Sequence, residues 1–392
     1  MQVQSRLRSL APTMKIGVDA SNLTTGGGVT HLVELLRAAE PRAHGFESII
    51  VWAGKSTLGR LEDRPWLNKV HVPTLDRALP FRIFWQCFRL AKLARREECN
   101  VLLVPGGSYL GEFRPFVTMS RNMLPFEWTE MGRYGWSWQW LRHAILRRTQ
   151  ARTFRRADGL IFLSQYAQTA VTEIVGPICG SATVIPHGIH DGFVQEPRLQ
   201  HDIREYSQER PFRILYVSKV DVNKHQWHVV DAIGRLRRSG IPVHLDLVGP
   251  PCGEAFKRLE RALTQTLNCD NFIHYHGDVS YSDLPRWYCG ADAFVFASSC
   301  ENMPNILLEA MACGMPIACS KMGPMPEVLR DGGIYFDPLE PDDIATAIKM
   351  LIESPRLRAD KAAMAYRRSK AFSWRRCDDE TFRFIQQVAT SA

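Results

Sequence analysis

Two glutamates, Glu301 and Glu309, are separated by seven residues within Ser298–Glu327. An apolar, strand-like run, Ala293–Ala297, precedes them, and a helical pattern follows, with Pro304 predicted in its first turn. The N–H groups at a helix start can hold phosphate oxygens, and a carboxylate one turn inside the helix tilts back towards that start. This arrangement favours a ligand that is both anionic and rich in hydroxyl groups, such as a sugar nucleotide.

The two carboxylates have different expected partners. We expect Glu309 to accept hydrogen bonds from a ribose diol, and Glu301 to accept them from the hydroxyls of a second sugar. The residues between and just after them are predicted to line the same donor site: Asn302, Met303, Asn305 and Ile306. The alternative is a plain strand–helix unit with two surface glutamates.

Two lysines, Lys219 and Lys224, follow the apolar run Ile214–Val217. Ammonium groups at the carboxyl end of a strand can neutralise a diphosphate. We therefore predict that both lysines bind phosphate, against the alternative of two exposed lysines in a polar loop.

Glycines mark two further strand ends. Gly26, Gly27 and Gly28 follow the first strand-like run and open a helix, while Gly106 and Gly107 follow another. Glycines let the backbone approach a ligand closely, although a GGG loop alone is more often a flexible turn. We expect both loops to lie on the acceptor side of a site.

Alternating strands and helices must position these residues. The alternation predicts β-α-β units and parallel sheets in two doubly wound domains, with ligands at the strand ends. The expected domains are residues 14–190 and 211–370, joined by a polar linker at 191–210, after an extension at 1–13. The predicted strands are Lys15–Asp19, Ser48–Trp52, Val101–Val104, Phe116–Met119, Gly159–Leu163, Ala182–Ile185, Arg213–Val217, His244–Val248, Ile273–Tyr275, Ala293–Ala297, Pro316–Cys319 and Ile334–Phe336.

Bulk composition is that of a globular protein of 392 residues, which is long enough for two domains. We expect neither a signal peptide nor a transmembrane helix, and ten reduced cysteines in a cytoplasmic protein. The net charge of +8 favours a polyanionic partner without deciding which one. The chain has no D-x-D motif, and neither His187/His190 nor His274/His276 has zinc-like spacing, so we expect no catalytic metal.

Taken together, the motifs resemble the retaining glycosyltransferases of family four, also called group 1. The matching elements are Glu301, Glu309 to Gly314, Pro326–Glu327, Val184–Ile189, Ile214–Lys224, Leu247–Gly249, Gly277–Ser280 and Phe372–Trp374. The resemblance implies the α/β GT-B fold, with two Rossmann-like domains facing a central cleft and a last helix, residues 371–392, that packs back on the first domain. It also implies that Ser218 and Gly277 bind the donor.

Several residues depart from the family pattern. Lys219 follows Ser218 where the family usually has an arginine after a glycine, and non-glycine residues stand between the two glutamates. Arg121 and Asn122 occupy the usual His-Asp position. We predict that Asn122 contacts the transferred sugar and that Arg121 meets phosphate charge on the acceptor side, with a structural role for both as the alternative.

One basic segment, residues 136–157, has six arginines and no acidic residue. On a helix, Arg148, Arg152, Arg155 and Arg156 share a face, and tryptophans precede them. This pattern is typical either of a solvated basic helix or of a helix lying on anionic lipid.

The resemblance therefore predicts a metal-independent, retaining hexosyltransferase of bacterial polysaccharide or lipopolysaccharide synthesis. Glu301, Lys219, Lys224 and Asn122 are the predicted catalytic residues. The expected donor is a GDP- or UDP-sugar, with a lean to GDP-mannose, and the expected acceptor is a saccharide, most readily a lipid-linked one. We expect a cytoplasmic location, in part peripheral on the membrane. The alternatives are a catalytically inactive partner subunit, a GT-B epimerase or phosphorylase, and a nucleic-acid-binding protein, for which no binding module is evident.

Overall fold

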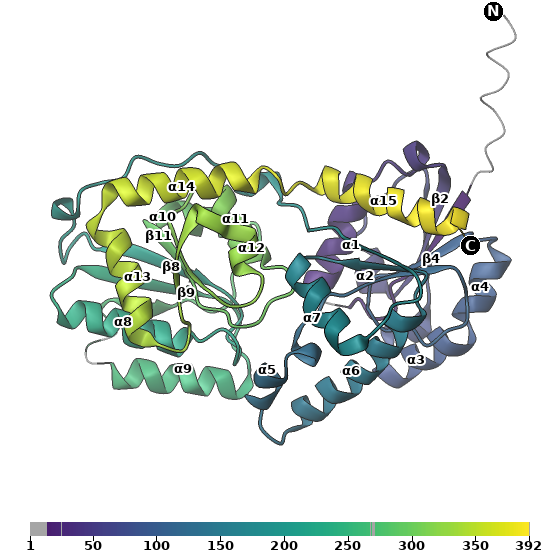
Figure 1. The fold of residues 1–392 in the computed structure, drawn as a ribbon, viewed down its shortest axis with the longest axis horizontal. Coiled ribbons are helices and arrows are strands. Elements are labelled where there is room, and N and C mark those ends of the chain that lie inside the picture. Colours follow the sequence, from purple (N-terminus) through teal and green to yellow (C-terminus); the bar gives the residue numbers. More distant parts are fainter. Residues whose placement is uncertain (1–13, 25, 267, 269–270, 392) are drawn as a thin grey trace, which may run out of the picture. The chain divides into compact units, whose positions relative to one another are not determined.

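The computed structural model describes residues 14–24, 26–266, 268 and 271–391, which form two compact units (Figure 1). Among the described residues, the first unit comprises those within 14–126, 141–188 and 374–391, and the second comprises those within 127–140 and 189–373. The expected extension at residues 1–13 lies outside the described residues.

The first unit is built on a seven-stranded parallel sheet in the order β3-β2-β1-β4-β5-β6-β7. Its strands are β1 (Met14–Asp19), β2 (Phe46–Ala53), β3 (Leu67–His71), β4 (Val101–Val104), β5 (Phe116–Met119), β6 (Gly159–Phe162) and β7 (Ser181–Val184). Every residue of β4, β5 and β6 is buried. Parallel strands covered on both faces must be apolar along their length, which explains why these strands read as short apolar runs.

Helices cover both faces of this sheet: α1 (Gly27–Ala38), α2 (Lys55–Leu58), α3 (Leu79–Phe88), α4 (Leu90–Arg96), α6 (Trp138–Arg156), α7 (Gln165–Val175) and α15 (Trp374–Ser391). The last helix, α15, packs against α1 and against β4, β5 and β6. The fit is close, because a Cβ on Gly159 of β6 would lie within 2.9 Å of the Phe384 and Val388 side chains. The expectation that the last helix packs on the first domain is confirmed.

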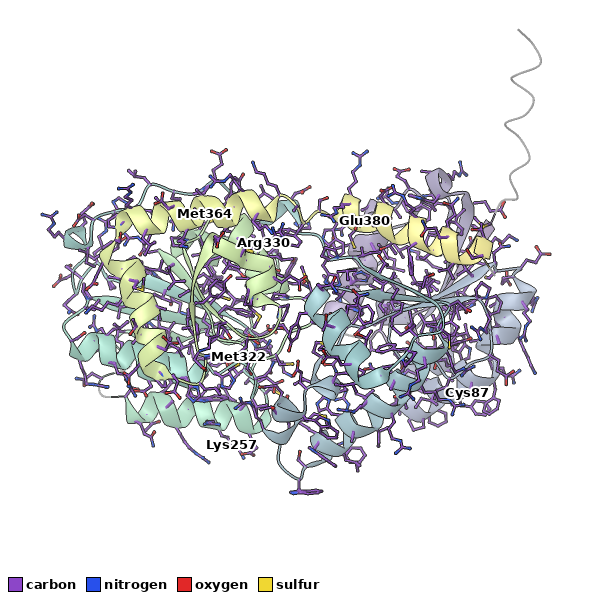
Figure 2. All side chains as sticks on the ribbon, in the orientation of Figure 1. Cys87, Lys257, Met322, Arg330, Met364 and Glu380 are labelled. Atoms are coloured by element: carbon purple, nitrogen blue, oxygen red, sulfur yellow. The ribbon has the colours of Figure 1, made fainter. Side chains whose placement is uncertain are left out.

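The second unit has a six-stranded parallel sheet in the order β10-β9-β8-β11-β12-β13. Its strands are β8 (Phe212–Val217), β9 (Val243–Val248), β10 (Ile273–Tyr275), β11 (Ala293–Phe296), β12 (Ile317–Ser320) and β13 (Gly333–Phe336). Its helices are α5 (Trp128–Gly132), α8 (Gln226–Arg238), α9 (Gly253–Gln265), α10 (Leu284–Gly290), α11 (Asn305–Ala312), α12 (Met325–Leu329), α13 (Pro341–Glu353) and α14 (Pro355–Ser369). Within each unit, side chains fill the space between sheet and helices (Figure 2). The predicted pair of doubly wound domains is confirmed.

Two segments behave differently from the prediction. Residues 127–140, expected in the first domain, cluster with the second unit. Residues 191–210, expected as a linker, also belong to the second unit, where the buried Arg358 of α14 donates from Nε to Gln200 (3.0 Å) and from Nη2 to the carbonyl of His201. A polar stretch with little apolar periodicity is thus fastened by hydrogen bonds, which periodicity does not reveal.

Candidate functional site

The strand order of the second sheet reverses at β8, which pairs with β9 on one side and β11 on the other. Ligands of doubly wound sheets bind beyond the strand ends at such a point. The loops that follow β8 and β11 are joined there, since Ser299 N–H donates to the Asn223 carbonyl (2.9 Å) and Asn223 Nδ2 donates to the Cys300 carbonyl (2.8 Å). Most of the predicted donor-binding residues lie on these two connected loops.

An ion pair joins Lys224 of the first loop to Glu301 of the second. Their side chains are 15% and 17% exposed, so both are screened from bulk water but remain accessible. The ammonium of Lys224 also donates to Ser298 Oγ (3.3 Å). Because an ammonium has three N–H donors, these two partners leave a third for a ligand oxygen.

Lys219, the other predicted phosphate ligand, is half-exposed and lies 3.1 Å from Asp221 Oδ2. The hydroxyl of Tyr134 donates to the other oxygen of Asp221 (3.2 Å) and fixes its orientation. Burial lowers the pKa of Lys219, but the charge and hydrogen bond of Asp221 outweigh it and hold the pKa above its usual value. Lys219 is therefore a cation at neutral pH.

Glu309 is the fifth residue of α11, about one turn inside the helix as predicted, and is 6% exposed. Tyr288 of α10 donates its hydroxyl hydrogen to Oε2 of Glu309 (3.1 Å). Burial raises the pKa of Glu309 to about 7, although the hydrogen bonds from Tyr288 and Tyr281 act to lower it. Because burial makes the charged form of Glu309 costly, additional hydrogen-bond donors, such as the two hydroxyls of a ribose, would stabilise it.

The start of α11 differs in one detail from the prediction. Pro304 lies just outside the helix, as its N-cap, instead of in the first turn. The N–H of Asn305 donates to the Met303 carbonyl (3.0 Å), so phosphate contacts at this helix start fall to the next N–H groups, beginning with Ile306. Asn302 and Met303 are buried beside them.

The remaining predicted donor residues lie at neighbouring strand ends. Ser218 follows β8 and is buried. Gly277 follows β10 with a φ of 71°, and its carbonyl accepts from the N–H of Gly249 (2.7 Å). Gly249 was absent from the predicted site, yet a Cβ there would lie 2.1 Å from the Ser218 carbonyl oxygen. The Leu247–Gly249 motif was the available signal for this close approach.

A segment that sequence reasoning missed also contacts these loops. Glu130 of α5 is buried and accepts from Ser299 Oγ (2.7 Å), while Arg133 Nε donates to its other oxygen (3.0 Å). His225 Nε2 lies 2.9 Å from the same Ser299 Oγ, and burial, then the charge of Arg133, lowers the pKa of His225 to about 3. Nothing in the sequence marks this contact, because Glu130 and Ser299 are 169 residues apart.

The glycine loops of the first unit occupy the equivalent position in their own sheet. They follow β1 and β4, the adjacent strands where that sheet reverses its order. The loops touch, since a Cβ on Gly106 would lie 3.2 Å from Asn22 Cβ. Arg121 Nη2 donates to the Gly27 carbonyl (2.7 Å), and its Nη1 would lie 3.2 Å from a Cβ on Gly28. Arg121 and the first glycine loop are thus brought together, and burial lowers the pKa of Arg121 to about 10.

Two glycines in these loops have left-handed backbone, Gly26 with a φ of 71° and Gly107 with a φ of 74°. A Cβ on Gly107 would also lie 3.0 Å from the Met119 carbonyl oxygen. The backbone conformation explains why glycine occupies both positions.

Asn122, predicted to contact the sugar, uses its Oδ1 to accept from the N–H of Leu124 (3.2 Å). This bond closes a local turn and supplies the structural role that was the alternative. Asn122 belongs to the first unit, whereas Glu301, Lys219 and Lys224 belong to the second.

The basic segment forms α6, as expected. Its arginines line a pocket of about 810 Å³ together with Leu110 and Ile174: Arg147, Arg148, Arg152, Arg155 and Arg156. Arg155 is tied down, since its Nε donates to the Val175 carbonyl (2.7 Å). In the described part of the chain, no helix has both the length and the apolarity to cross a bilayer.

A second surface feature went unnoticed in the sequence. Helix α3 exposes a row of large apolar side chains, each between 37% and 61% exposed: Leu79, Phe81, Ile83, Phe84 and Phe88. Both α3 and α6 hold the loop after β4, because Gln86 Nε2 donates to the Ser108 carbonyl (3.1 Å) and Thr153 Oγ1 accepts from the N–H of Tyr109 (2.9 Å). The run LPFRIFWQCF reads as an ordinary buried helix.

Comparison with known proteins gives consistent matches along the chain. A family model described as "Glycosyl transferases group 1" matches residues 174–368, and one described as "Glycosyltransferase Family 4" matches residues 25–193.

Among curated relatives, O-antigen chain mannosyltransferase B of Escherichia coli is 36% identical over 112 residues, which are 29% of this chain and 29% of that protein. A GDP-mannose-dependent alpha-(1-6)-phosphatidylinositol monomannoside mannosyltransferase of Mycolicibacterium smegmatis is 28% identical over 253 residues, 61% of this chain and 63% of that protein. In both cases the match spans less than two thirds of the relative's length.

Among solved structures, sucrose-phosphate synthase from Thermosynechococcus elongatus superposes with a TM-score of 0.76 at 17% identity, covering 97% of this chain and 100% of that one. At this identity the likeness establishes the fold, and the predicted GT-B architecture is confirmed.

Proposed function

Since the chain belongs to the group 1 glycosyltransferases of family 4, we propose that it moves a hexose from a nucleoside-diphosphate sugar to a saccharide acceptor with retention of the anomeric configuration. The Lys224–Glu301 ion pair is the observation that supports this proposal most directly. In this pair, Lys224, which suits a phosphate, lies beside Glu301, which suits sugar hydroxyls, at the point where the strand order of the second sheet reverses.

In the proposed complex each group of the donor has a ligand of matching chemistry. The diphosphate lies between Lys219, Lys224 and the N–H groups that begin at Ile306. Glu309 accepts from the ribose hydroxyls, and Glu301 from hydroxyls of the transferred hexose. Tyr288 keeps Glu309 oriented before the donor arrives.

The proposed transfer needs no covalent enzyme intermediate. The bond from the anomeric carbon to the diphosphate oxygen breaks while the acceptor hydroxyl oxygen bonds to that carbon from the same face. The hydroxyl proton passes to the departing phosphate. The lysines and the helix start stabilise the negative charge that grows on the diphosphate, and we propose that this replaces a catalytic metal.

Mannose carried by GDP is the donor we favour. Two relatives are named as mannosyltransferases, and one of these names specifies GDP-mannose. A UDP-hexose is the competing donor, because the ligands described above recognise phosphates, ribose and hexose but not the base.

A lipid-linked saccharide in bacterial surface-polysaccharide synthesis is the acceptor we propose. The loops with Gly27, Gly106 and Arg121 would receive the sugar. Five arginines around one pocket of the same unit suit anionic groups at a membrane surface. The apolar row on α3 suits the interfacial layer of a bilayer, which makes the protein a peripheral one on the inner face of the cytoplasmic membrane.

The test is a matrix of donors and acceptors. Release of nucleoside diphosphate from GDP-mannose only in the presence of a lipid-linked saccharide supports the proposal, and the anomeric configuration of the product reports retention. Release without an acceptor, or with phosphate as acceptor, would favour an epimerase or a phosphorylase. A protein that binds no nucleoside diphosphate by calorimetry would be an inactive partner subunit.

A further inference from the structure

Three histidines gather around one aspartate on a face of the second sheet, near its β10 edge. Asp246 and His244 lie two residues apart on β9 and so point to the same face. His274 of β10 is the ladder partner of Asp246. His276 follows β10 directly. The spacing of His274 and His276 along the chain is not zinc-like, so the sequence alone gave no sign of this cluster.

Three ligand atoms in this cluster converge. His244 Nε2 lies 3.2 Å from Asp246 Oδ1 and 3.0 Å from His274 Nδ1, and the three atoms all lie within 4.8 Å of one another. Among the described residues, this is the group whose histidine, cysteine or carboxylate atoms are spaced to share a metal ion.

Hydrogen bonds alone satisfy this arrangement poorly. If His244 Nε2 carries its proton, that one proton must serve both the Asp246 oxygen and the His274 nitrogen. If it does not, its lone pair faces the Asp246 carboxylate oxygen. A cation placed among the three lone pairs satisfies all of them at once.

We propose that His244 Nε2, His274 Nδ1 and Asp246 Oδ1 bind a divalent metal ion of the class that prefers imidazole, with zinc as the expected ion. Tetrahedral zinc, with ligands about 2.0–2.2 Å away, places its ligand atoms about 3.3 Å apart. The observed separations of 3.0 and 3.2 Å need only a small adjustment to reach this value. Water or an anion would complete the coordination.

Two neighbours hold the carboxylate in the orientation such a site needs. Arg213 Nη2 donates to Asp246 Oδ2 (2.8 Å), the oxygen that does not face His244. His276 Nε2 lies 2.7 Å from Oδ1, where it can donate to the second lone pair of that oxygen. Groups in this second layer typically change metal affinity 10–100-fold when they are removed.

The surroundings leave room for a further ligand of the ion. Asp246 lines a pocket of about 540 Å³ together with Arg213, Arg286 and Trp287. One carboxylate and two neutral imidazoles leave a bound divalent ion with net positive charge. Both arginines add to this charge, and Asp283, which also lines the pocket, offsets only one of them. The open position therefore suits an anion.

The proposed metal is separate from transfer chemistry. On α10, Tyr288 donates a hydrogen bond to Glu309, while Arg286 and Trp287 line the pocket that Asp246 also lines, so the helix presents different residues to the two places. The ion would join β10, an edge strand of three residues, to β9. Its expected effect is on stability rather than on the glycosyl step.

Calorimetry on the full-length, tag-free protein tests this site, with zinc ions alone as the probe. We expect one ion per chain, a thermal midpoint that rises with zinc concentration, and at least a tenfold weaker affinity in His244→Asn and His274→Asn. The matched control is His201→Asn, because His201 is also a histidine of the second unit paired with a carboxylate, Glu205. Equal affinity in all three variants, or no binding at micromolar zinc, would overturn the site.

Cobalt(II) separates this site from the cysteines of the chain. A cobalt spectrum without a thiolate charge-transfer band, lost in His274→Asn, supports nitrogen and oxygen ligands, whereas a strong thiolate band would place the ion elsewhere. Since a histidine variant can fail by unfolding, each variant is melted in chelator first. Midpoints equal to that of the parent protein in chelator, with only the zinc-dependent rise missing, are the expected result. A rise that persists in both variants rejects the proposal.

Discussion

The hydroxyl of Tyr288 in α10 donates a 3.1 Å hydrogen bond to Oε2 of Glu309 in α11. The carboxyl group it contacts is 6% exposed, and burial raises its pKa to about 7. The protein therefore keeps a carboxylate where its charge is costly. That cost is the expected consequence of the role we propose for Glu309, which is to bind ribose hydroxyls.

Replacing this carboxyl group should raise the stability of the protein at alkaline pH and weaken donor binding. A folded-state pKa above the ordinary value of 4.5 contributes stability that is complete below about pH 4.5 and lost as the pH rises through 7. Glu309→Gln should therefore match the parent protein near pH 5 and be more stable at pH 8, by up to about 3 kcal/mol. Urea denaturation at both pH values measures this difference.

Donor binding should change in the opposite direction. Hydrogen bonds to a charged group contribute about 1.5–3 kcal/mol, so Glu309→Gln should bind a nucleoside diphosphate roughly 10–100-fold more weakly at pH 8. A 2′-deoxynucleotide serves as the control ligand, because it has already lost one of the hydroxyls. If the variant and the parent protein show the same pH profile of stability, the assigned pKa of Glu309 is wrong.

The Lys224–Glu301 pair predicts a non-additive pattern of stability. Lys224→Met alone leaves a largely buried carboxylate without its cation and should destabilise the second unit by roughly 2 kcal/mol, below the value for fully buried pairs. The double variant Lys224→Met/Glu301→Gln should recover most of this loss, yet remain at least 100-fold less active. Unfolding midpoints and turnover of all four proteins form the cycle. Simple additivity of the stability changes would show that the pair is not coupled.

The meeting of the loops after β8 and β11 could be predicted from the sequence, because parallel strands end at one edge of a sheet. Lys219, Lys224 and Glu301 each follow a recognisable apolar strand, so the topology alone brings their loops together. The same reasoning found every strand except β3, an edge strand in which only Leu67 is buried and no apolar run exists. The fold and the positions of these loops could therefore be predicted from the sequence alone.

Contacts between segments that are far apart in the sequence could not be predicted from it. Glu130 meets Ser299 across 169 residues, and His274 meets His244 across 30 residues through strand pairing. The local role of Asn122 was also not evident from the sequence, since its side chain accepts a hydrogen bond from the N–H of Leu124 and so closes a turn. Spacing rules describe one helix or one loop at a time, and these contacts depend on the register between separate elements.

The arginines of α6 predict salt-sensitive recruitment to anionic membranes. Arg148, Arg152 and Arg156 should be replaced by Gln together, sparing Arg155 because its bond to Val175 helps to hold α6. At about 1 kcal/mol for each basic residue near the surface, the triple variant should bind anionic vesicles about 100-fold more weakly. Co-sedimentation at low and high salt measures the change.

A matched charge control accompanies this triple variant. Arg356, Arg367 and Arg375 are exposed and lie outside α6, so changing them to Gln removes the same net charge elsewhere. Equal losses in both triple variants would assign recruitment to overall charge and reject the role of α6. Phe84→Ser/Phe88→Ser tests the apolar row of α3 separately, and we expect its loss of binding to persist at high salt.

Gly249→Ala should damage the donor site through the backbone of Ser218. Gly249 has a φ of 141°, and an added Cβ would lie 2.1 Å from the Ser218 carbonyl oxygen, so the loop that bears Lys219 must move. We expect a loss of about 2 kcal/mol of stability together with at least tenfold weaker donor binding.

Gly240→Ala is the control, because Gly240 also has a positive φ, 86°, but nothing lies within 4 Å of its added Cβ. It should lose stability while donor affinity stays unchanged. Equal donor affinity in the two variants would show that the Ser218 backbone does not position the phosphate ligands.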